Sequence, residues 1–201
     1  MAMSGTTKVL LVAVAAGLLG VAAGLMVNGP GPLLRTEAGQ RALNAAAAAS
    51  APAPPAGVEV ARRGAAIPDV SVALLDGGTL RLPADRAGRP VLVNLWASWC
   101  GPCIEEMPEL ERFATAQGET GTAVVGIALD DEVAVRDFLR KIPVSYTIAL
   151  DAAGPADAGV RLGNPKGVLP YTALIDADGR LVKQRIGPFE HGEIDGWARL
   201  D

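Results

Sequence analysis

The chain has 201 residues, a formal net charge of −4 and a pI near 5.1; half of its residues are hydrophobic, but only 4% are aromatic. This length accommodates one globular domain plus accessory segments. The acidic balance and the lack of a dense Lys/Arg stripe argue against a nucleic-acid-binding protein.

The first predicted element is an apolar segment at 9–27, which follows a short polar N-terminus at 1–8. It carries no charge and is long enough to span a bilayer as a helix, so we predict an uncleaved, single-pass signal anchor. Lys8 favours a cytoplasmic N-terminus. The alternatives are a cleaved signal peptide, whose apolar core is usually shorter, and a buried core helix. Both export interpretations place the rest of the chain on the periplasmic side of the inner membrane, where disulfides persist.

Residues 28–65 have the composition of a linker, rich in Ala, Pro and Gly. The sequence Gly29-Pro30-Gly31-Pro32 breaks any helix that leaves the membrane. The alanine-rich stretch that follows can form a helix from Thr36, and the segment at 51–55 predicts an extended, proline-rich spacer. We interpret 28–65 as a tether for a globular domain at 66–201.

The predicted domain begins with a β-hairpin, in which strands at 70–75 and 79–82 flank the turn Asp76-Gly77-Gly78. A nearly continuous apolar run at 91–97 is typical of a central strand buried on both faces. A helix is expected at 102–117, with a kink at Pro108.

The second half continues with a strand at 123–129, a helix at 131–141 and a strand at 144–150. Strands at 171–175 and 181–186 then flank another turn, and a short helix is expected at 191–200. This order predicts an α/β domain with a mixed central sheet and helices on both faces.

Both cysteines of the chain lie in Trp99-Cys100-Gly101-Pro102-Cys103, between the predicted strand at 91–97 and the helix. A Cys-x-x-Cys pair at such a junction is typical of a dithiol redox centre, because the helix N-terminus favours the thiolate. A structural zinc site is one alternative, but it needs four ligands and the chain adds only one histidine, His191. A purely structural disulfide would close a very small loop and restrain the unfolded chain little.

The stretch from Val93 to Cys103, followed by Glu105-Glu106-Met107-Pro108-Glu109-Leu110, resembles the thioredoxin superfamily. Within it, the stretch is most similar to the membrane-anchored TlpA/ResA-like thiol-disulfide oxidoreductases found outside the cytoplasm. The segment 167–176 resembles the part of that family around its cis-proline. Together these motifs imply a thioredoxin-like fold over about 67–201, with the β-hairpin as an N-terminal extension.

Helix geometry and spacing assign Cys100 as the nucleophile and Cys103 as the thiol that resolves the mixed disulfide. The resemblance implies that Gly101-Pro102 favours a reducing couple. It also implies that Pro170 is cis and that the backbone of Leu169 pairs with an extended substrate segment. We expect Trp99 to flank the site and shape docking, whereas Trp96 belongs to the core.

The resemblance places Glu106 near the cysteines, as a residue that handles protons or tunes a thiol pKa. The alternative is a solvated glutamate in the first turn of the helix. Asn94 stands where thioredoxin has a buried aspartate, and an amide cannot shuttle a proton. Glu105 and Glu109 are expected to face solvent.

The sequence thus predicts an enzyme that reduces disulfides of periplasmic client proteins, without a cofactor or a bound metal. In this family, apocytochrome c and copper-site proteins are plausible clients, and a membrane thiol donor of the DsbD/CcdA type would supply electrons. The alternative is a Cu(I) metallochaperone that uses Cys100, Cys103 and Met107, because soft sulfur ligands select Cu(I). The distance of His191 along the chain disfavours it, and we expect this histidine on the surface.

Overall fold

The computed structural model describes residues 6, 9–14, 16–17, 20, 29 and 31–200. Within these residues, no helix is both long enough and apolar enough to cross a membrane. Much of the predicted anchor at 9–27, and nearly all of the N-terminus at 1–8, lie outside the described residues. The anchor therefore stays a prediction.

Two helices occupy the predicted linker: α2 (Gly31–Arg35) and α3 (Glu37–Ala49). The hydroxyl of Thr36 accepts a hydrogen bond from the N–H of Gly39 at 3.1 Å and so caps α3. The helix expected from Thr36 is confirmed. The proline-rich residues 51–55 after it form neither helix nor strand, as the composition predicted.

A seven-stranded mixed sheet forms the centre of the domain, in the order β2-β1-β5-β4-β3-β6-β7. The strands are β1 (Val70–Leu74), β2 (Thr79–Leu82), β3 (Val91–Trp96), β4 (Ala123–Leu129), β5 (Thr147–Asp151), β6 (Tyr171–Ile175) and β7 (Leu181–Ile186). Strands β3, β4 and β5 run parallel, and all other neighbours are antiparallel. Every residue of β3 is buried, which confirms it as the central strand.

Both predicted hairpins are present. In the first, Gly77 and Gly78 adopt φ of 98° and 90°, a left-handed conformation that glycine tolerates best. In the second, the Asp176 carboxylate accepts hydrogen bonds from the N–H groups of Asp178 and Arg180. Turn chemistry readable in the sequence therefore fixes the position of both turns.

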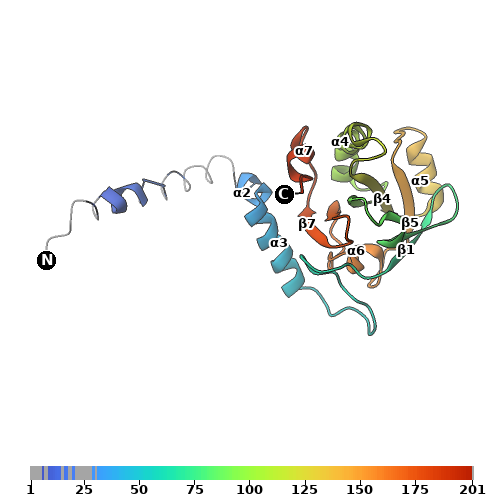
Figure 1. Cartoon of the computed structure of the whole chain (residues 1–201), viewed down its shortest axis with the longest axis horizontal. Helices are drawn as coiled ribbons and strands as arrows, with labels where there is room; N and C mark the ends of the chain where they lie inside the picture. The colour runs from blue at the N-terminus through green and yellow to red at the C-terminus, as the bar shows by residue number, and fades with distance from the viewer. Residues whose placement is uncertain are drawn as a thin grey trace. The chain divides into compact units, whose positions relative to one another are not determined.

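Three helices cover one face of the sheet: α4 (Gly101–Gln117), α5 (Glu132–Leu139) and α7 (Glu193–Trp197). Figure 1 shows them together on one side, where they pack on the buried cluster that includes Leu92, Trp96 and Leu174. The other face is covered by the short helix α6 (Ala158–Arg161) and the segment around Ile67, which pack on a second buried cluster that includes Val93 and Leu95.

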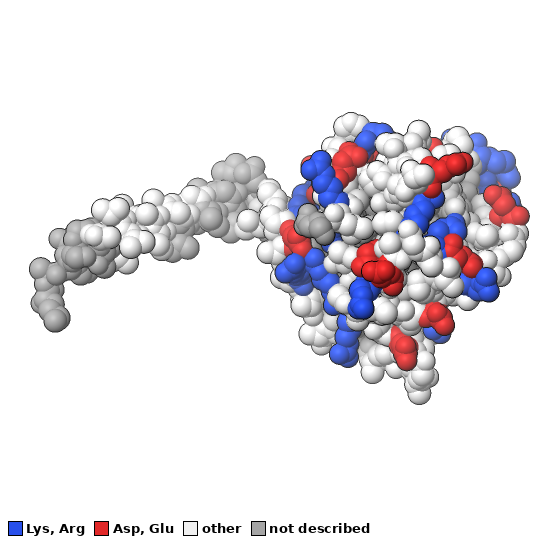
Figure 2. Space-filling view, in the orientation of Figure 1, with Lys and Arg blue, Asp and Glu red and all other residues white. Residues whose placement is uncertain are grey.

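The elements differ from the sequence prediction in three respects. The last helix is shorter than 191–200, since it begins after Gly192 at a left-handed φ of 76°. Helix α6 was not predicted, because four residues are too few for a periodic pattern. Strand β5 runs over 147–151 instead of 144–150. Pro108 lies inside α4, as predicted, and the kink expected there stays a prediction. On the face of the domain shown in Figure 2, acidic and basic side chains are interspersed.

Candidate active site

The two cysteines lie where β3 leads into α4, as predicted. Cys100 is the N-cap of α4, and its Sγ accepts a hydrogen bond from the N–H of Cys103 at 3.3 Å. The cysteines form a disulfide with a Cα–Cα distance of 5.3 Å. The site is therefore seen in its oxidised form, with the Cys100 sulfur aligned to the free N–H groups that stabilise a thiolate.

The two sulfur-bearing residues differ in access. Cys103 is fully buried, whereas Cys100 keeps 6% of its surface exposed. Next to it, Trp99 is 71% exposed, and Gly101 and Pro102 also lie at the surface. An incoming sulfur can approach only Cys100, which fits its predicted role as nucleophile.

The predicted cis-proline segment reaches the same edge of the sheet. Strand β6 runs antiparallel to β3 and pairs Tyr171 with Leu95, so Pro170 lies at the end of β3 that leads to Cys100. The Leu169–Pro170 peptide bond is cis, as predicted. Leu169 and Trp99, the chain neighbours of Pro170 and Cys100, line one cavity of about 300 Å³.

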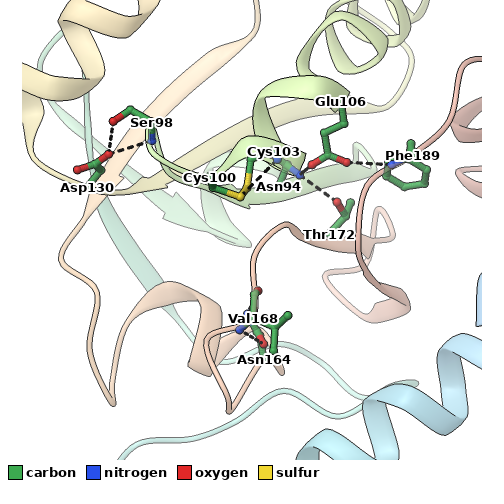
Figure 3. Close-up of a disulfide and its surroundings, with 10 residues drawn as sticks. All are labelled: Asn94, Ser98, Cys100, Cys103, Glu106, Asp130, Asn164, Val168, Thr172 and Phe189. Carbon is green, nitrogen blue, oxygen red and sulfur yellow. Dashed lines mark hydrogen bonds between the residues drawn. A yellow bond between two sulfur atoms is a disulfide. The ribbon is translucent and has the colours of Figure 1, made fainter.

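Glu106 lies one helical turn beyond Cys103 and points into the domain (Figure 3). Its side chain is completely buried, so the alternative of a solvated glutamate is wrong. One carboxylate oxygen accepts a hydrogen bond from Nδ2 of Asn94 at 2.8 Å, and the other accepts one from the N–H of Phe189 at 3.1 Å. Asn94 also donates to the hydroxyl of Thr172 at 3.1 Å.

Burial raises the pKa of Glu106 to about 7, because desolvation disfavours the carboxylate. The hydrogen bonds from Asn94 and Phe189 and the charge of Arg185 offset part of this effect. Arg185 is itself engaged by a bidentate ion pair with Glu193 at 2.8 and 2.9 Å. Glu106 therefore changes its protonation state near neutral pH, as a proton-handling residue requires.

The expectation that Glu109 faces solvent is wrong. This residue is 5% exposed and accepts two hydrogen bonds from Arg112, at 2.9 and 2.7 Å, and one from the N–H of Gly192. The paired Arg112 guanidinium holds the pKa of Glu109 below its usual value, although burial opposes the shift. The pKa values of Glu106 and Glu109, three residues apart on α4, are thus shifted in opposite directions. Glu105 is exposed, as predicted.

The remaining predicted residues take the expected places. Trp96 is fully buried, and His191 is a surface residue whose Nδ1 lies 3.3 Å from a carboxylate oxygen of Glu109. Met107 is a buried residue of α4 that packs into the core. Within the part of the chain that the structure describes, no three His, Cys, Asp or Glu residues group as metal ligands.

Sequence reasoning missed Thr172 and Arg185, which surround Glu106. Thr172 lies between Tyr171 and Ala173 in a predicted strand, where a buried polar side chain needs a partner. Arg185 follows Lys183 and Gln184, a polar run typical of an exposed strand face. A polar residue between hydrophobic neighbours in a core strand was the signal that could have found Thr172, and the sequence holds no such signal for Arg185.

Comparisons with known proteins agree with this site. The Redoxin family model matches residues 62–197. The chain is 30% identical over 133 residues to the thiol-disulfide oxidoreductase ResA of Bacillus cereus, covering 66% of this chain and 74% of that protein. A thioredoxin-related protein from Neisseria meningitidis matches with a TM-score of 0.55 and 32% identity, over 62% of this chain and 93% of that structure. A thiol:disulfide interchange protein from Chlorobium tepidum matches with a TM-score of 0.57 and 26% identity, over 68% and 95%.

Proposed function

Because this chain belongs to the Redoxin family and is a thiol-disulfide oxidoreductase, we propose that it acts as a reductant of client-protein disulfides outside the cytoplasm. The observation that carries the proposal is the Cys100–Cys103 pair at the start of α4, with only Cys100 accessible. The Gly101-Pro102 dipeptide between the cysteines supports the reducing direction by its resemblance to reducing members.

The reaction starts from the dithiol form. The Cys100 thiolate attacks one sulfur of a client disulfide, forming a mixed disulfide and releasing the other client sulfur as a thiolate. Cys103 then loses its proton and attacks the Cys100 sulfur. The client is released with both sulfurs reduced. Its two electrons come from Cys100 and Cys103, which are left joined as the disulfide seen here.

Glu106 is the proposed acceptor of the Cys103 proton. It lies one turn away, it is shielded from solvent, and its pKa of about 7 matches it to proton transfer near neutrality. Asn94 cannot take this role, since an amide does not titrate in this range. Instead, Asn94 orients the carboxylate through its 2.8 Å hydrogen bond.

The client is proposed to bind as an extended segment against the edge formed by Leu169 and Pro170. Its backbone would pair with that of Leu169, as in other cases where a peptide adds to an exposed strand. Trp99, Gly101 and Pro102 complete the contact surface, and their exposure supports this assignment.

The setting is proposed from the sequence. The apolar segment at 9–27 would hold the chain in the inner membrane, and the linker would let the domain reach clients in the periplasm. A membrane thiol donor of the DsbD/CcdA type would restore the dithiol, with apocytochrome c or copper-site proteins as clients. Membrane fractionation and N-terminal sequencing test this, because a mature chain that starts after residue 27 would refute the anchor.

Trapping experiments test the chemistry. Cys103→Ser should accumulate mixed disulfides with clients in cells, and Cys100→Ser should trap none. The reverse pattern would overturn the assignment of nucleophile and resolving thiol. A redox titration should give a potential near the thioredoxin value of about −270 mV, whereas one near the DsbA value of about −120 mV would indicate an oxidant.

A further inference from the structure

A buried amide holds the loop before the cis-proline (Figure 3). The Nδ2 of Asn164 donates to the carbonyl of Val168 at 2.8 Å, and the Oδ1 of Asn164 accepts from the N–H of Val168 at 3.1 Å. Asn164 is only 2% exposed. One side chain thus satisfies both backbone groups of Val168, while the backbone of the next residue, Leu169, makes no hydrogen bond among the described residues.

A carboxylate holds the loop on the other side of the cavity. One oxygen of Asp130 accepts hydrogen bonds from both the N–H and the hydroxyl of Ser98, at 2.9 and 2.6 Å. Ser98 immediately precedes Trp99, whose ring is largely exposed and therefore has little packing of its own to fix it. The position of Trp99 depends on its backbone, and Asp130 anchors that backbone to the end of β4.

Each of the two held loops forms a wall of one cavity. Trp99 and Leu169 line it together with Leu129 and Pro155, and these first two residues are the chain neighbours of Cys100 and Pro170. We infer that Asn164 and Asp130 are positioning residues for client binding, which keep the two walls at the separation that an extended client segment needs. This inference rests on the proposed reductase function and adds to it the residues that prepare the binding surface.

The physical reason is the entropy of ordering. When a flexible loop becomes ordered on client binding, the lost conformational entropy weakens the binding, whereas a loop that is already ordered in the free protein has no such cost. Misplacement of a reacting segment by about 1 Å can cost on the order of 100-fold in rate. A small disulfide with no extended backbone contacts Cys100 alone and does not need either wall.

This difference gives the test. The full chain, reduced beforehand, is mixed with insulin or with the small disulfide dithionitrobenzoate, and the second-order rate constant is measured in a single turnover. Asn164→Ala and Asp130→Ala should each lower the rate constant for insulin about tenfold. The rate constant for dithionitrobenzoate should stay within about twofold of the unmodified protein, because Cys100 keeps its place at the start of α4.

The molecule offers matched controls near the N-terminal ends of strands β4 and β5, away from the dithiol. There Glu111 holds the N–H and hydroxyl of Ser145 at 2.7 and 2.6 Å, the same chemistry as the Asp130 contact. The Gln117 side chain likewise holds the N–H of Thr122 at 2.9 Å. Glu111→Ala and Gln117→Ala should leave both rate constants unchanged.

Three outcomes would overturn the inference: an unchanged insulin rate in both site variants, an equal fall with both disulfides, or an equal loss in the controls. If Asn164→Ala does not fold, Asn164→Asp retains the acceptor for Val168 N–H and should show a smaller, still selective loss. An unmodified protein that reacts with dithionitrobenzoate but not with insulin would refute the reductase proposal itself, and this inference with it.

Discussion

The burial of Glu106 leads to a quantitative prediction about Glu106→Gln. In the unfolded chain this carboxyl titrates near 4.5, and in the folded domain burial raises its pKa to about 7. At any pH between these two pKa values, the folded protein therefore keeps a proton on this carboxyl that the unfolded chain has lost. The free energy of unfolding must fall as the pH rises from about 4.5 to about 7.

The size of the effect follows from the shift. One pKa unit corresponds to about 1.4 kcal/mol, so the difference amounts to about 3 kcal/mol, of which about 2.5 kcal/mol appears between pH 5 and pH 8. Glu106→Gln removes this loss because the amide does not ionise. Both oxygens of the Glu106 carboxylate accept hydrogen bonds from N–H donors. In the glutamine variant, the side-chain NH₂ would face one of these donors, which should lower the free energy of unfolding by about 1 to 2 kcal/mol at every pH. Relative to the unmodified protein, the variant should become more stable as the pH rises.

Urea denaturation of the oxidised proteins at pH 5, 6, 7 and 8 measures this difference. The matched control is Glu105→Gln on the same turn of α4, whose side chain is exposed. A stability difference for Glu106→Gln that does not change between pH 5 and pH 8 would refute the reasoning, because burial would then not perturb the carboxyl.

Three further predictions concern α4 and the sheet. Glu106→Gln should also alter the pH dependence of thiol alkylation near neutrality, and an unchanged profile would remove Glu106 from the proton-handling role. Glu109→Gln should cost about 1 to 3 kcal/mol at pH 7. Its pKa is lowered, so the carboxylate stabilises the fold above its unfolded pKa, and the cost should shrink on acidification. Gly126→Ala should cost about 1 to 3 kcal/mol in urea denaturation, since the added Cβ would lie 3.0 to 3.1 Å from three core side chains. Gly196→Ala, which meets nothing within 4 Å, should be tolerated.

The sequence alone determined the order of the seven strands and the position of the redox centre. Local patterns carry this information: an apolar run for β3, turn residues at Asp76-Gly77-Gly78, and two cysteines one helical turn apart at a strand–helix junction. These features depend on residues adjacent in the chain, so no tertiary contact was needed to find them. The resemblance located Pro170 and its cis peptide bond in the same way.

Only the tertiary structure determined which carboxylates on α4 are buried and in which direction their pKa values are shifted. Glu105, Glu106 and Glu109 look alike in the sequence, yet the first is exposed, the second is buried with a raised pKa, and the third is buried with a lowered one. The difference comes from residues distant in the chain, namely Asn94 from β3 and the backbone at 189–192 before α7. Burial and pKa are properties of the assembled surroundings, and a helical pattern shows only which face a residue shares. For the same reason the contact of Asp130 with Ser98 became visible only in the folded sheet, where the neighbouring strands β3 and β4 end side by side.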